Sequence, residues 1–383
     1  MHCTHENVSP RLHSTAVVIL TALAAGCGGA PVTDRSPGAG GDSSGSGGAA
    51  GAPVELPSLP WPLTAFPELP DIAIDVPEER IALGNLLFFD PVLSIDGETA
   101  CGTCHSEFWG MSDGLPLGVG QGAGLPAGPP REGPNTTRRN SISLFNVAFR
   151  QTLFWDGRSD SLQEQAIMPL LEENELNLDP DVAIARLFAI PEYVDLFAAA
   201  FPDDPRVTLD NLAAALASFQ RTFISDRSLY DAYLKGHLGT LDDELIEGMF
   251  RFAEMGCHDC HVPPLFESES FEDRNVPGVA GIEDDGLAEV TELPEDVGRF
   301  RTPSLRNAAV TEPYFHNGSV PTLAQAVEHE LEQSGLPFTD EDVRLIERFI
   351  RKALRDESRA AQRPMTVPSG LPVPLDGQLF PFL

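Results

Sequence analysis

The sequence predicts an all-α fold built from two domains with long irregular loops. A chain of 383 residues is long enough to bury two hydrophobic cores. Helical periodicity recurs along the chain, whereas the alternation typical of strands is weak throughout. Each half repeats one plan, in which a predicted helix is followed by a closely spaced pair of cysteines. This repeat places a domain boundary near residues 235–240.

The first predicted helix spans residues 77–89. Its proline suits the first turn, and Glu78 and Glu79 lie near the positive end of the helix dipole. Further helices are predicted over residues 161–171, 180–188, 208–224, 240–255, 322–333 and 339–355. Thr240 and Thr339 are expected to cap the helices that they begin.

The composition is strongly acidic, with a formal net charge of −33 at pH 7. This charge makes nucleic acid an unsuitable partner, because a phosphate backbone would be repelled. A basic protein partner would be steered toward such a surface. Alternatively, the acidity only keeps the protein soluble.

The N-terminal residues 1–26 are expected to form a signal peptide. The apolar run 16–25 is too short to span a bilayer and suits a signal-peptide core, so we expect export to the periplasm or cell envelope. Small residues precede Cys27 as in a bacterial lipoprotein box, although leucine usually stands at the position of Ala24. Cys27 would then carry lipid, and residues 27–70 would be a disordered tether rich in Gly, Ser and Pro. The alternative is cleavage nearby, which leaves Cys27 as a free thiol.

Four of the six cysteines form two C-x-x-C-H motifs, and the other two, Cys3 and Cys27, are single. The motifs are Cys101-Gly102-Thr103-Cys104-His105 and Cys257-His258-Asp259-Cys260-His261. Two thiols at this spacing reach the two vinyl groups of one haem, and the adjacent histidine then binds the iron. A zinc site or a thioredoxin-like redox pair would require four clustered ligands or a βαβ pattern instead. The sequence therefore predicts two covalent c-type haems, around which the long loops 114–134 and 266–298 would pack.

Several longer blocks resemble the bacterial di-haem cytochrome c peroxidases, a family that includes the enzyme maturing the tryptophan-derived quinone of methylamine dehydrogenase. The resemblance covers roughly residues 81–354. Its blocks are LGNLLFFD (83–90), FWDGR (154–158), SLQEQA (161–166), FRTPSLRN (300–307) and PYFHNG (313–318).

The resemblance implies two cytochrome c-like domains, each around one haem. The first, peroxidatic domain would span residues 71–237 and the second, electron-transfer domain residues 238–363, followed by a Pro-rich tail over 364–383. Peroxide would be cleaved at the first haem, and electrons from a small cytochrome c or cupredoxin, expected to be basic, would enter at the second. The possibility of a homodimer is left open.

The resemblance also implies roles for single residues. Glu175 lies twenty residues after Trp155 and corresponds to the family's catalytic carboxylate, while Gln165 lies ten residues after it and corresponds to the pocket glutamine. A carboxylate in a dry pocket can take a proton from one peroxide oxygen and return it to the other. Without the resemblance, Glu175 would be interpreted as a solvated acid. Trp155 would lie between the haems and relay electrons, and Arg301 would lie near the haems, where it could also pair with a propionate.

A calcium site between the domains is implied by the same resemblance. It maps onto Asn140, Thr311 and Pro313, the last two through backbone oxygens, which suit a hard cation.

The sequence departs from the family at two haem ligands. Some relatives carry a histidine sixteen residues after the proximal histidine of the first haem, and this residue is Gln121 here, a poor iron ligand. The distal ligand of the second haem, a methionine or tyrosine in relatives, corresponds to Glu330. Glu330 could bind iron as a hard carboxylate or face solvent. Loss of methionine would lower the reduction potential of this haem.

These observations predict an exported di-haem peroxidase that reduces hydrogen peroxide to water. One rival is an enzyme that withdraws electrons from a protein or organic substrate through Trp155, which the absence of the methionine ligand favours. The other is an electron carrier without catalysis, and such a carrier would not need Glu175 and Gln165.

Overall fold

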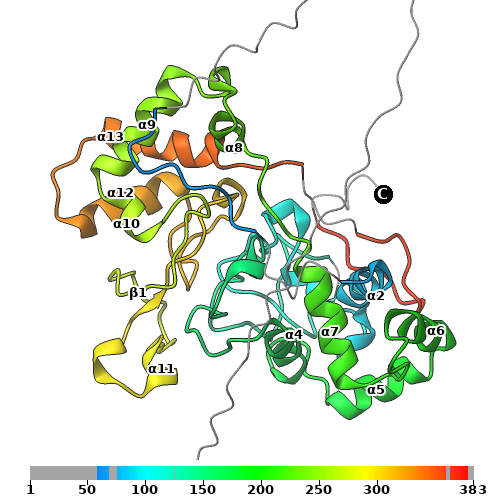
Figure 1. The fold of residues 1–383 in the computed structure, drawn as a ribbon. Helices are drawn as coiled ribbons and strands as arrows, with labels where there is room; N and C mark the ends of the chain where they lie inside the picture. The colour runs from blue at the N-terminus through cyan, green and yellow to red at the C-terminus, as the bar shows by residue number, and fades with distance from the viewer. Residues whose placement is uncertain (1–57, 69–75, 125, 359–362, 378–383) are drawn as a thin grey trace, which may run out of the picture. The chain divides into compact units, whose positions relative to one another are not determined.

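The structure is a computed structural model that describes residues 58–68, 76–124, 126–358 and 363–377 (Figure 1). All of these residues belong to one compact unit that spans 53–383. The predicted signal peptide, Cys27 and most of the predicted tether lie outside the described residues. No helix within the described part is both long and apolar enough to cross a membrane.

The described chain is mainly helical, which confirms the predicted fold class. The longer helices are α2 (Glu78–Phe89), α4 (Leu162–Leu171), α5 (Pro180–Phe188), α6 (Pro191–Ala200), α7 (Leu209–Gln220), α8 (Leu229–Leu234), α9 (Asp243–Glu254), α12 (Leu323–Ser334) and α13 (Asp340–Arg348). Each C-x-x-C motif forms one short helix, α3 (Cys101–Cys104) and α10 (Cys257–Cys260), and α11 (Ala288–Thr291) is also short. The strands β1 (Phe271–Glu272) and β2 (Phe300–Arg301) pair antiparallel, with Phe271 opposite Arg301.

Single turns of other helix types fill the connections. Among the described residues, six are 3₁₀ turns: Pro91–Leu93, Glu107–Trp109, Val147–Phe149, Leu238–Thr240, Pro294–Asp296 and Ala308–Val310. One segment of the same described part is π-helical, Phe349–Ala353, and it continues α13. The predicted helix over 339–355 is therefore an α-helix followed by a wider turn.

The helix that precedes each cysteine motif packs closely on a later helix, so the predicted repeat is visible in the packing. In the first half, α2 contacts α7, and a Cβ at Gly84 would clash with the carbonyl of Ala215. In the second half, α9 contacts α13, and a Cβ at Gly248 would clash with the carbonyl of Leu345. Glycine at these two positions allows the helix backbones to approach.

Two large hydrophobic clusters accompany these helix pairs. The first contains Leu83, Leu87 and Phe88 of α2 together with residues of α5, α6 and α7. The second contains Met249 and Phe252 of α9 together with residues of α8, α12 and α13. Trp61, from the segment that precedes α2, belongs to the second cluster and donates its Nε1–H to the Tyr230 hydroxyl at 3.0 Å. The predicted domain limits themselves stay a prediction.

Most helix starts agree with the sequence within one or two residues, and Thr339 is the predicted cap, with its Oγ1 accepting from Asp342 N. Thr240 was the wrong cap for α9. Asp242 caps that helix, because its Oδ1 accepts from Leu245 N at 2.8 Å, while Thr240 Oγ1 donates to the carbonyl of His237. The helix α7 ends at Gln220, four residues before the predicted end.

The C-terminal segment 363–377 packs on the first half of the chain. Val367 and Val373 belong to the first hydrophobic cluster. Asp376 Oδ2 accepts hydrogen bonds from Ser106 Oγ at 3.2 Å and from Trp109 Nε1 at 2.9 Å. These contacts place the end of the described chain beside the first C-x-x-C-H motif.

Candidate haem sites and active site

Each C-x-x-C motif closes into one helical turn that carries a cysteine at both ends. In α3, the backbone N–H of Ala100 donates to Thr103 Oγ1 at 2.9 Å, which fixes the start of the turn. The two thiols and the following histidine of each motif line one common cavity. This is the arrangement that two thioether bonds to a single haem require.

The two proximal histidines are held in the tautomer that a metal ligand needs. His105 Nδ1 lies 2.8 Å from the carbonyl oxygen of Met111, and His261 Nδ1 lies 3.0 Å from that of Pro303. Because a carbonyl only accepts, each Nδ1 carries the hydrogen and each Nε2 keeps its lone pair. Burial lowers the pKa of both imidazoles, which favours the neutral, ligating form. The residues present therefore fit two c-type haems.

The zinc alternative finds no support within the described ranges. They contain no group of three or more His, Cys, Asp or Glu side chains placed to hold a metal ion.

The first cavity measures about 40 Å³ and is lined by Cys101, Cys104 and His105 together with Gln165 and Glu175. The structure thus brings both predicted catalytic side chains to the first motif. Burial, reinforced by the nearby charge of Glu172, raises the pKa of Glu175 to about 7, and Arg158 opposes this shift. At neutral pH the carboxyl can therefore exchange a proton in either direction.

A further glutamine, Gln220 at the end of α7, lines the same cavity and was missed by the sequence analysis. Its side chain is buried, and its Oε1, like that of Gln165, has no hydrogen-bond partner among the described residues. Helix α7 is otherwise rich in Ala, Leu and Phe along its buried face. A lone amide at the end of such a helix was the available signal.

Gln121 does not line the first cavity within the described structure, although its neighbour Gly120 does. The Gln121 side chain donates from Nε2 to the carbonyl of Glu173 at 3.3 Å. Its backbone N–H donates to the carbonyl of Glu175 at 2.8 Å. A Cβ at Gly120 would clash with the carbonyl of Asn174, so the loop passes very close to the segment that carries Glu175.

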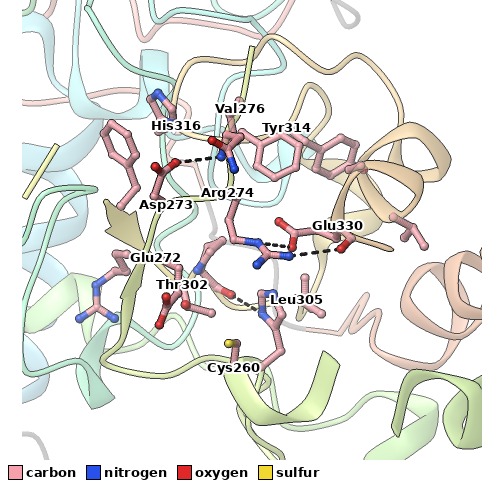
Figure 2. A pocket seen from close by; sticks show the side chains of 18 of the residues that line it. Cys260, Glu272, Asp273, Arg274, Val276, Thr302, Leu305, Tyr314, His316 and Glu330 are labelled. Carbon is pink, nitrogen blue, oxygen red and sulfur yellow. Dashed lines mark hydrogen bonds and ion pairs between the residues drawn. The ribbon is translucent and has the colours of Figure 1, made fainter. Parts of the chain in front are cut away.

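The second cavity is larger, about 510 Å³, and contains Cys257, Cys260, His261 and Glu330 in its wall (Figure 2). Glu330 Oε2 accepts from Arg274 Nε at 2.7 Å, and Arg274 Nη2 also donates to the Glu330 carbonyl at 3.2 Å. Figure 2 shows the Arg274 side chain pointing toward Glu330, with Cys260 below both in the view.

Trp155 and Arg301 line the second cavity and do not line the first within the described structure. The Trp155 indole donates to the carbonyl of Asn140 at 2.9 Å, and the Trp155 carbonyl accepts from Arg301 N at 2.8 Å. The Arg301 guanidinium is fully buried and pairs with Glu269 and Thr152. Arg301 is thus already neutralised by the protein itself.

The predicted calcium ligands are not joined to one another by hydrogen bonds among the described residues. Asn140 donates from Nδ2 to the carbonyl of Leu115 at 2.8 Å, and Thr311 Oγ1 donates to the carbonyl of Ala308 at 3.3 Å. Pro313 follows Thr311 in the connection between Ala308–Val310 and α12. The calcium site stays a prediction.

A helical chain with two C-x-x-C-H turns, each with a histidine fixed for metal binding, defines a c-type di-haem oxidoreductase. A sequence profile of the di-haem cytochrome c peroxidase family matches residues 78–238. Cytochrome-c peroxidase IdrP1 of Pseudomonas sp. (strain SCT) is 36% identical over 304 residues, which cover 70% of this chain and 76% of that protein. The chain belongs to the di-haem cytochrome c peroxidase family, and it is an oxidoreductase of that family.

Two MauG proteins are also similar. Methylamine utilization protein MauG of Methylorubrum extorquens is 35% identical over 254 residues, which cover 66% of this chain and 68% of that protein. The solved structure of a MauG-like protein associated with microbial copper homeostasis has a TM-score of 0.67 and 26% identity. It covers 80% of this chain and 97% of that chain, which places the described fold in the MauG-like class.

Proposed function

We propose that the protein reduces hydrogen peroxide to water at the first haem site, using electrons from a small redox protein. The observation that carries this proposal is that Glu175, a partly buried carboxyl, lines one cavity with Cys101, Cys104 and His105 and has its pKa raised to about 7. A carrier of electrons has no need of a proton-exchanging carboxyl in its haem pocket. The family relationship supports the same reaction.

Haem iron, when bound, supplies the electrons that break the O–O bond. Glu175 contributes proton transfer: its carboxylate accepts a proton from one peroxide oxygen and returns it to the other, so that water leaves instead of hydroxide. Gln165 orients the substrate by hydrogen bonding and, being an amide, does not compete for the proton.

The second haem site is proposed to receive electrons. Trp155 lines this cavity and is hydrogen-bonded through its indole N–H, which fixes the ring in place for electron relay. The formal charge of −33 favours a basic cytochrome c or cupredoxin as donor. Asn140, Thr311 and Pro313 are proposed to bind one Ca²⁺ through oxygen atoms.

The second candidate function is oxidation of a protein or organic substrate through Trp155. One observation favours it: Glu330, a carboxylate paired with Arg274, stands in the second cavity at the position where a methionine ligand was expected for a peroxidase. A hard anionic group near the iron disfavours ordinary electron entry by lowering the potential.

Steady-state turnover separates these functions. The holoprotein is mixed with peroxide and a reduced basic cytochrome c, and cytochrome oxidation is followed. We expect peroxide-dependent oxidation with two cytochromes consumed per peroxide. Peroxide consumption without cytochrome oxidation would favour the substrate oxidase. Absence of peroxide consumption would favour an electron carrier.

We also propose that the protein is exported and anchored by lipid at Cys27, on the basis of the small-residue box and the tether behind it. Fractionation tests the anchor: the wild type should sediment with membranes and the Cys27→Ser variant should not. A wild type that is soluble after export contradicts the anchor.

A further inference from the structure

The wall of the second cavity includes the ion pair of Arg274 and Glu330. Arg274 approaches Glu330 with two donors: Nε binds the carboxylate Oε2 at 2.7 Å, and Nη2 binds the Glu330 carbonyl at 3.2 Å. Both side chains are about one-third exposed, so they face the cavity and are not sealed inside the core. Among the described residues, the second carboxylate oxygen, Oε1, has no hydrogen bond.

Three neighbouring side chains that could bind a metal make other contacts. His329, next to Glu330 on α12, does not line the cavity, and its Nε2 lies 2.8 Å from the backbone carbonyl of Arg274. Tyr314 lines the cavity but donates its hydroxyl to the carbonyl of Ala308 at 2.8 Å. His316 stacks flat on Phe300, with ring centroids 3.5 Å apart.

Figure 2 separates these groups in space. Tyr314 and His316 lie in the upper part of the view, whereas Glu330 and the guanidinium of Arg274 lie in its middle, with Cys260 below them. Glu272 and Glu330 both line the cavity, and Glu330 is the one of the two that a cation, Arg274, holds there with its second oxygen left unbound among the described residues.

We propose that Glu330 is the sixth ligand of the second haem iron through Oε1, and that Arg274 is the residue that positions it. This inference rests on the proposed function insofar as that function requires a haem at Cys257, Cys260 and His261. The two donors of Arg274 fix the direction of the carboxylate, because a guanidinium that binds both the side chain and the backbone of one residue restricts its rotamer. A hard anionic oxygen ligand favours the ferric state, so the potential of this haem should lie below that of a methionine-ligated one.

The test is spectroscopic and is made on the holoprotein without peroxide or donor. Electron paramagnetic resonance and near-infrared magnetic circular dichroism are recorded on the resting ferric state of the wild type, Glu330→Gln and Glu330→Met. We expect the signals of one haem to change in Glu330→Gln while those of the other stay constant. Glu330→Met should give the near-infrared band of a methionine ligand and a higher reduction potential for that haem.

Two matched variants test specificity. Glu328→Gln changes an exposed carboxylate on the same helix, and Glu272→Gln changes another carboxylate of the cavity wall. Both should keep the wild-type spectrum. Arg274→Lys keeps the positive charge but cannot bind the Glu330 side chain and backbone together, so it should broaden the second-haem signals without abolishing oxygen ligation.

The outcomes are distinguishable from those of the peroxidase assay. Mass measurement first confirms that each variant carries two haems. Unchanged spectra in Glu330→Gln, or a change in Glu272→Gln instead, would overturn the ligand assignment. Absence of peroxide turnover in a wild type whose spectra respond to Glu330→Gln would overturn the proposed function and leave the ligand assignment standing.

Discussion

The backbone N–H of Gln121 donates to the carbonyl oxygen of Glu175 at 2.8 Å. This bond ties the glycine-rich loop 118–122 to the segment that carries the proposed catalytic carboxylate. Because the connection runs through the backbone, substitution of either side chain should leave it in place. A change in activity after a side-chain substitution at either position can therefore be assigned to the side chain and not to loss of this bond.

Glu175→Gln should retain both haems and lose most peroxide turnover. The amide has nearly the same shape as the carboxyl but cannot accept a proton, and a positioned acid–base group typically contributes roughly a hundredfold to ten-thousandfold in rate. Glu173→Gln, which changes an exposed neighbour, serves as control and should retain activity. Stopped-flow reaction with peroxide measures both. A Glu175→Gln rate within a few-fold of wild type would remove Glu175 from the mechanism.

The rate of the peroxide reaction should rise with pH through about 7. Burial raises the pKa of Glu175 to about 7, and only the deprotonated form accepts the substrate proton, so the reactive fraction increases as pH increases through that value. Glu172→Gln removes a charge that raises this pKa. The rise in rate should therefore occur at lower pH in this variant. The pH–rate profile of Glu175→Gln should not show this rise near pH 7. A profile that is the same in all three proteins contradicts this assignment.

The oxidised protein should react with peroxide without prior reduction. Gln121 points its amide to the carbonyl of Glu173 and does not line the first cavity in the described structure, so it does not close the iron site. The oxidised protein is mixed with peroxide in a stopped-flow spectrometer without reductant. A rapid change in the Soret band is the expected result. Gln121→His should introduce a ligand that makes activation necessary. A low-spin, unreactive first haem in the wild type would show that another group closes the site.

Gln220→Leu should slow the peroxide reaction while leaving the free energy of unfolding unchanged or increased. The buried Oε1 of Gln220 has no protein partner, so its removal relieves a polar group that was costly to bury. If the amide binds the substrate, loss of one neutral hydrogen bond of about 0.5–1.5 kcal/mol slows the reaction roughly two- to tenfold. Asp210→Asn, an exposed change on the same helix, is the control. An unchanged rate with increased stability would assign Gln220 a structural role only.

Denatured protein should exceed the polypeptide mass by two haems. Each C-x-x-C-H turn presents two thiols on one side of a helical turn, which allows two thioether bonds. The double variant Cys101→Ala/Cys104→Ala should lose one haem, and Cys257→Ala/Cys260→Ala the other. An increment of fewer than two haems in wild type made with its attachment machinery would contradict the cofactor prediction.

The sequence predicted those features that depend on local pattern. Some signals lie within a few residues of one another, and the helices and turns that they begin were predicted. Examples are Pro77, Thr339 and the two cysteine motifs. Thr240 was wrong because Asp242 competes for the same role, and an aspartate two residues later caps α9. Helix α6 was missed although Tyr193, Phe197 and Ala200 are buried at helical spacing, because it follows α5 after a short break.

A site residue was predicted only where it stands at a fixed distance along the sequence from a motif of the family. Glu175 and Gln165 do line the first cavity. The sequence marks Gln220 only as a lone amide at the end of an apolar helix, and its place in the cavity comes from the packing of α7 on α2. Arg274 likewise lies in a long connection without a motif, and only the folded chain shows that it meets Glu330. Contacts of high sequence separation leave no local signal.

The contact of Asp376 with Ser106 and Trp109 joins almost the last described residues to the turn that follows the first haem motif. Asp376 lies 270 residues after Ser106 in the chain, so the first motif is bordered by residues from both ends of the described fold. Arg363, from the same C-terminal segment, pairs with Glu107 in the turn after the motif. The surroundings of the first haem motif are therefore complete only when the last described segment is in place, and removal of that segment should loosen this side of the site.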